Sequence, residues 1–94
     1  MKFLSAAAKI TTRQIAVTET PESLDPNRSY ITNRVLLSAS ALGAFVGGQN
    51  VNTSTGFPVP AVPSTPLVLW ISTPGELYVV GGQTVYVILE EPER

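Results

Sequence analysis

The sequence predicts an all-β fold, either a small antiparallel β-sandwich or a jelly-roll-like barrel, preceded by an N-terminal arm. Five or six short apolar runs have the spacing and the Val, Ile, Thr and Tyr enrichment typical of strands. Seven glycines and eight prolines separate these runs, and no long stretch has the apolar period of a helix. The 94 residues are expected to form one domain at residues 13–94, with the arm at residues 1–12.

The predicted arm carries both apolar and basic side chains. Phe3, Leu4 and Ile10 are apolar positions that an arm would bury on a neighbour, and Lys2 and Lys9 are its charges. A frayed terminus is the alternative interpretation.

The first two strands follow from alternation. Residues 14–20 alternate, with Ile15 and Val17 on one face, and a turn-rich connection follows in which Leu24 is the one apolar anchor. Residues 30–39 form the second predicted strand, and its inward positions are expected to be Ile31, Val35 and Leu37.

The middle of the chain is divided by glycine and proline. Phe45 and Val46 predict a short strand that ends at a glycine pair, after which a polar loop runs to residue 56. Four prolines within residues 57–66 exclude a helix and a central strand. That segment is expected to be an extended edge with Val59 and Val62 turned inward.

The last third contains three further predicted strands. Residues 67–72 predict a strand buried on both faces, with Trp70 in the core. Residues 73–76 have the proline and glycine of a type II turn. Residues 77–80 and 84–89 are two apolar runs joined across a glycine pair, which predicts a hairpin.

Charge is absent from residues 35–75 and is confined to the two ends of the chain. The net charge of −1 argues against nucleic acid as the main partner. Arg28 and Arg34 are instead expected to pair with Glu76, Glu90 or Glu91 on adjacent strands or on other subunits.

Several function classes lose their usual residues. The chain has no cysteine and no histidine, so the common ligands of zinc and haem are missing, and so is the base that would activate a serine. The glycine pairs lack the lysine and the helix of a phosphate-binding loop. We expect neither an enzyme nor a cofactor. The apolar run at residues 3–8 is too short for a secretory signal, and no run reaches the ~20 residues of a membrane span, so no membrane partner is expected.

Five short motifs occur in a recognisable order. They are an arginine-led strand, an aromatic-Val-Gly strand end, a Gly-apolar-Pro-apolar step, a Gly-Glu-Leu-Tyr turn and a final Val-x-Val-x-x-Glu strand, at residues 34–37, 45–48, 56–59, 75–78 and 85–90. In this order, across residues 28–91, the chain resembles a small β-sandwich or jelly-roll-like structural module of tailed-bacteriophage virions, of the capsid decoration (cement) type. The extra prolines of residues 57–66 depart from that pattern.

The resemblance implies a non-enzymatic virion protein on the capsid surface, made in the bacterial host cytoplasm. Its partners would be copies of itself, as a homotrimer, and the major capsid protein, which the N-terminal arm would reach. A component of the tail, fibre or head–tail connector is the alternative within the virion. An alternative of another class is a carbohydrate- or host-surface-binding module, with Trp70 and Tyr78 as stacking platforms. For these two side chains, a core tryptophan and a half-buried strand tyrosine are the favoured interpretation.

The uncharged connecting segments are where we place the interface, because a polar loop and a proline-rich edge cannot be core. The candidate interaction residues are Lys2, Phe3, Leu4, Lys9, Ile10, Arg28, Arg34, Gln49, Asn50, Asn52, Phe57, Pro60 and Pro63.

Overall fold

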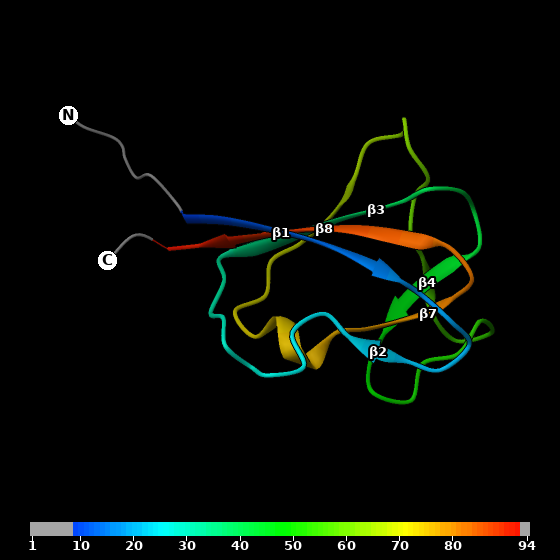
Figure 1. Cartoon of the computed structure of the whole chain (residues 1–94), viewed down its shortest axis with the longest axis horizontal. Coiled ribbons are helices and arrows are strands. Elements are labelled where there is room, and N and C mark those ends of the chain that lie inside the picture. The colour runs from blue at the N-terminus through cyan, green and yellow to red at the C-terminus, as the bar shows by residue number, and fades with distance from the viewer. Residues whose placement is uncertain (1–8, 93–94) are drawn as a thin grey trace.

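A computed structural model describes residues 9–92 of the chain as two layers of β-strands (Figure 1). The elements are β1 (Lys9–Ala16), β2 (Glu22–Ser23), β3 (Arg34–Ala39), β4 (Ala44–Gly47), β5 (Phe57–Pro58), β6 (Leu67–Leu69), the 3-10 helix η1 (Pro74–Glu76), β7 (Tyr78–Gly81) and β8 (Thr84–Glu91). The predicted all-β class is confirmed.

The strands form two antiparallel sheets of four, in the orders β1-β8-β3-β6 and β2-β7-β4-β5. The first strand pairs with the last, the second with the seventh, the third with the sixth and the fourth with the fifth. This is the order of a jelly roll, in which one long antiparallel ribbon is folded over so that its halves share two sheets. The arrangement is an open sandwich and not a closed barrel.

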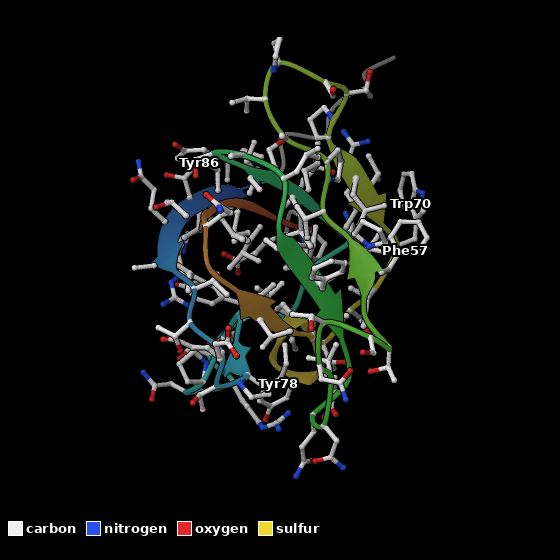
Figure 2. All side chains as sticks on the ribbon, turned by 90° about the vertical axis from the view of Figure 1, so that its right-hand side faces the viewer. Phe57, Trp70, Tyr78 and Tyr86 are labelled. Atoms are coloured by element: carbon white, nitrogen blue, oxygen red, sulfur yellow. The ribbon has the colours of Figure 1, made fainter. Side chains whose placement is uncertain are left out.

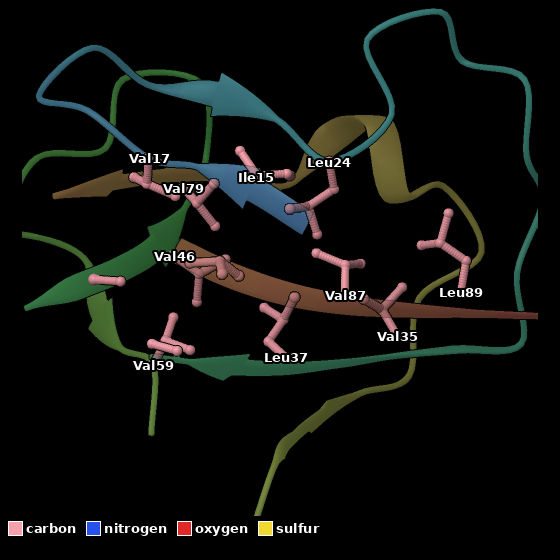
Figure 3. Close-up of a cluster of buried hydrophobic side chains, with 13 residues drawn as sticks. Ile15, Val17, Leu24, Val35, Leu37, Val46, Val59, Val79, Val87 and Leu89 are labelled. Carbon is pink, nitrogen blue, oxygen red and sulfur yellow. The ribbon is translucent and has the colours of Figure 1, made fainter. Parts of the chain in front are cut away.

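The core lies between the two sheets and is built from strand alternation (Figure 3). On β3 and β8, every second side chain is buried, as in Val35 and Leu37 on one strand and Val87 and Leu89 on the other. Covering a Val or Leu side chain completely contributes about 1.5–3 kcal/mol, so these alternating positions fix which face of each strand turns inward. Leu24, the predicted anchor of the first connection, is fully buried.

The predicted hairpin across Gly81 is wrong. β7 pairs with β2 and β4, whereas β8 pairs with β1 and β3 in the other sheet. The chain therefore crosses between the sheets at this point. Gly81 has φ +133°, and a Cβ there would collide with the backbone oxygen of Gly43. A glycine is required at this position, but it lies where the chain passes from one sheet to the other and not in a hairpin turn.

The starts of β1 and β3 differ most from those predicted. β1 begins at Lys9, so residues 9–12, placed in the arm by the sequence, are strand residues that pair with residues 88–91 of β8. β3 begins at Arg34, and Ile31, predicted to face inward, is 59% exposed. The neighbouring Thr32 is buried in its place and donates its hydroxyl to Ile71 O at 2.7 Å.

The edge prediction for the proline-rich segment is confirmed in part. β5 is an edge strand and Val59 is buried, but Val62 is 49% exposed. The strand predicted to be buried on both faces is β6, which lies at the other sheet's edge and is only half-buried. Residues 74–76 form the 3-10 helix η1, where a type II turn was predicted.

Candidate interaction surface

One side of the sandwich is open, because its two edge strands, β5 and β6, do not close over the core. Phe57 of β5 pairs with the inward-facing Val46, so its ring belongs to the inner face. Leu67 and Leu69 of β6 are likewise inner-face residues, since they pair with buried positions of β3. Phe57 nevertheless remains 62% exposed. We call Phe57, Leu67, Val68, Leu69 and Trp70 the β5–β6 edge.

An apolar cleft of about 300 Å³ opens between these edge strands. No polar side chain lines it, and its walls are Val46, Gly47, Phe57, Leu67, Leu69 and Leu77. Small-molecule sites combine apolar walls with a few placed polar groups that fix the orientation of the ligand. This cleft is an accessible part of the hydrophobic core and offers apolar contact only.

The apolar surface continues from the cleft onto the outer face of the first sheet. Leu36 lies between Ile88 on one side and Val68 on the other in the cross-strand register. All three side chains are only half-buried. On a sheet face that is exposed to water, the outward-facing residues are normally polar. This apolar row therefore continues the exposed apolar surface of the β5–β6 edge onto the outer face of the first sheet.

Trp70 directly follows β6 and is 75% exposed, contrary to the predicted core position. Figure 2 shows it on the same side of the sandwich as Phe57. The guanidinium carbon of Arg34 lies 5.3 Å from the centre of its ring. A cation at this distance is attracted to an aromatic face. The Arg34 guanidinium therefore covers one of the two faces of the Trp70 ring.

Arg34 is held in that position by Glu90. Its Nε donates to Oε1 of the glutamate at 2.6 Å, and its Nη2 donates to Oε2 at 3.2 Å. The hydrogen bond and then the carboxylate charge raise the pKa of the Arg34 guanidinium. The predicted pairing is thus confirmed within one chain, and the bidentate geometry orients the cation over Trp70.

Arg28, also predicted as an interaction residue, pairs with Glu76 at 2.7 Å. Both side chains are largely exposed. This pair joins the β2–β3 connection to η1, whereas the β5–β6 edge involves neither element. Arg28 has φ +53°, a left-handed conformation suited to a turn.

The predicted polar-loop residues shape their own loop and do not line the cleft. Gln49 and Asn50 are exposed. The Asn52 side-chain oxygen accepts hydrogen bonds from the backbone N–H groups of Ser54 at 2.8 Å and Thr55 at 3.0 Å. This arrangement is a local Asx turn, so Asn52 acts in loop geometry.

The remaining predicted residues are dispersed. Pro60 is half-buried and Pro63 is exposed in the connection that links β5 to β6. Lys9 and Ile10 are exposed on β1, at the opposite edge of the first sheet from β6. The first three predicted arm residues, Lys2, Phe3 and Leu4, lie outside the described residues. Of the candidate set, the structure brings Phe57 and Arg34 to the β5–β6 edge.

Sequence reasoning missed Val68 and the two leucines of β6 as surface residues, and it favoured a core position for Trp70 over the exposed stacking platform of the alternative. A strand buried on both faces and an uncovered edge strand have the same apolar sequence. Pro66, directly before β6, does not separate the two cases, because a proline is tolerated at the start of a central strand as well as on an edge strand.

Within residues 9–92, no helix is long and apolar enough to cross a membrane, and no cluster of three or more His, Cys, Asp or Glu residues is placed to hold a metal ion. Comparisons with protein-family models, curated proteins and solved structures found no match to this chain.

Proposed function

We propose that this chain is a structural protein of a tailed-bacteriophage virion, a capsid decoration protein that stabilises the head shell as a homo-oligomer, with a trimer as the expected state. Its partners are copies of itself and the major capsid protein, and its location is the capsid surface after synthesis in the bacterial cytoplasm. The ordered motifs at residues 34–90 favour this function. The jelly roll agrees with it, although that fold also serves other proteins.

The β5–β6 edge is the observation that carries the proposal. It exposes part of the core through a cleft without polar walls, and the whole of residues 35–75 is uncharged. An isolated domain in water normally covers such a surface or interrupts it with charge. A protein that works packed among neighbours needs no such protection, because the neighbours exclude water.

The test has two parts. Size-exclusion chromatography with light scattering is expected to give a mass that is a multiple of three times the 10.0 kDa chain. Sedimentation with assembled heads of the phage that encodes the chain is expected to remove it from the supernatant, and antibody labelling is expected to place it on the head. A stable monomer that stays in the supernatant would contradict the proposal. Labelling of the tail, fibre or connector would favour the virion alternative.

The exposure of Trp70 favours a second candidate, a carbohydrate-binding module, because sugars stack on exposed aromatic rings. Two observations weigh against it. Arg34 occupies one face of the ring, and the adjoining cleft has no polar side chain to bond hydroxyls. Binding on a glycan array that is lost in Trp70→Ala, with an unchanged circular dichroism spectrum, would select this candidate.

A further inference from the structure

β6 is the least protected of the edge strands. Natural sheets prevent edge-to-edge pairing with charged side chains, prolines or very short strands. β1 carries Lys9 and Arg13, β2 carries Glu22 and β5 contains Pro58. β6 is short, but its three residues are Leu-Val-Leu, with neither a charge nor a proline.

The backbone of Val68 points toward this free edge. Ala39, at the end of β3, exchanges two backbone hydrogen bonds of 2.9 Å with the segment that leads to β6. Because bonding direction alternates along an antiparallel strand, every second residue of β3 bonds toward β6. These residues include the partners of Leu67 and Leu69. The N–H and C=O of Val68, between them, are therefore directed away from β3.

We propose that β6 pairs with β6 of a second copy of this chain, about a two-fold axis through Val68. The segment Leu67-Val68-Leu69 reads the same in both directions, so an antiparallel pair about this axis is self-complementary. Val68 would exchange two hydrogen bonds with Val68 of the second copy, and Leu67 would lie opposite Leu69. The two four-stranded sheets would become one sheet of eight strands.

In this register, the second copy would also cover the exposed apolar surface beside β6. Pro66 lies opposite Trp70 of the second copy on the outer face, and the two apolar clefts adjoin on the inner face. Trp70 and Phe57, 75% and 62% exposed, would together bury roughly 300 Å² per copy. That is about a third of the ~800 Å² that each partner of a stable complex buries, before the leucines and prolines are counted.

The absence of charge from this region suits a two-fold contact in particular. A residue on the axis meets its own copy, so any charge there would face a like charge. The pairing rests on the proposed self-association and adds to it. A two-fold contact does not close a trimer, so it joins two single chains or two trimers.

The experiment uses charge at the axis. Val68→Lys and Val68→Glu are each expected to weaken the pairing roughly 100-fold and to halve the mass measured by light scattering. An equimolar mixture of the two variants is expected to restore the mass, because opposite charges then meet at the axis. With one of the two variants labelled with nitrogen-15, native mass spectrometry identifies the mixed assembly from its intermediate mass. Thr12→Lys, in the same cross-strand row but on the opposite edge strand, is expected to leave the mass unchanged.

The chain's single tryptophan gives an independent readout. Trp70 emission is expected to shift to longer wavelength when the wild type is diluted and to be shifted already in Val68→Lys. A wild-type mass that neither substitution changes would overturn the proposal, and so would a halved mass that the mixture does not restore. Val68→Lys that still sediments with phage heads leaves the decoration function standing, so the two proposals fail separately.

Discussion

The two sides of the sandwich are closed in different ways, although each is crossed by a connection between the sheets. On the β1–β2 side, Val17 in the connection and Leu24 directly after β2 are buried between the sheets, and Leu24 N–H donates to Leu77 O at 2.9 Å. On the β5–β6 side, the connection buries Val59 alone and turns Val62 outward. The cleft is what remains. A connection seals a sandwich when it contributes enough apolar side chains to the core, and the proline-rich connection contributes one.

The largest expected effect tests the closed side. Leu24→Ala leaves a cavity between the sheets, so the free energy of unfolding should fall by about 3 kcal/mol. Urea denaturation followed by far-ultraviolet circular dichroism measures this change. A loss below ~1 kcal/mol would mean that the segment after β2 does not seal the core.

The matched substitution on the open side is Leu69→Ala. Because Leu69 is only half-buried, the same assay should give a loss of about 1 kcal/mol. The measurement is made at a dilution where wild type and variant have the same mass by light scattering. A loss as large as that of Leu24→Ala would show that the β5–β6 edge is covered in the folded single chain.

The smallest effect is expected at the Arg28–Glu76 pair, because Arg28 lies in the same β2–β3 connection as Leu24 but at the surface. Both side chains are more than half exposed, so water and salt screen their attraction. A double-mutant cycle with Arg28→Ala and Glu76→Ala should give a coupling below ~1 kcal/mol that falls as salt rises. A larger coupling would indicate that this pair fixes the β2–β3 connection on η1.

Local pattern was enough where burial follows strand period. Val35 and Leu37 were predicted to face inward, and both are fully buried. The pairing of Arg34 with a glutamate of the last strand followed from charge alone, because the chain offers few anions. Phe57 lies at the open cleft, and its role as an interaction residue stays a prediction.

Local pattern failed where the answer depended on distant segments. Trp70 follows an apolar run that is typical of a core strand, yet nothing within the described residues covers β6 on its free side. β6 pairs only with β3, about thirty residues earlier in the chain, so no local pattern could show that β6 is the edge strand of its sheet.

What the sequence determined by itself is the class of fold, the inward faces of the long strands and the lack of charge from residue 35 to residue 75. These properties depend on side chains a few positions apart. The tertiary structure alone decided that the chain crosses between sheets at Gly81 and that Trp70 faces water. The physical reason is that a glycine allows the backbone to turn in several directions. The sheet that the next strand joins is chosen by burial against residues far away in the chain, such as Val35 and Leu37 for β8.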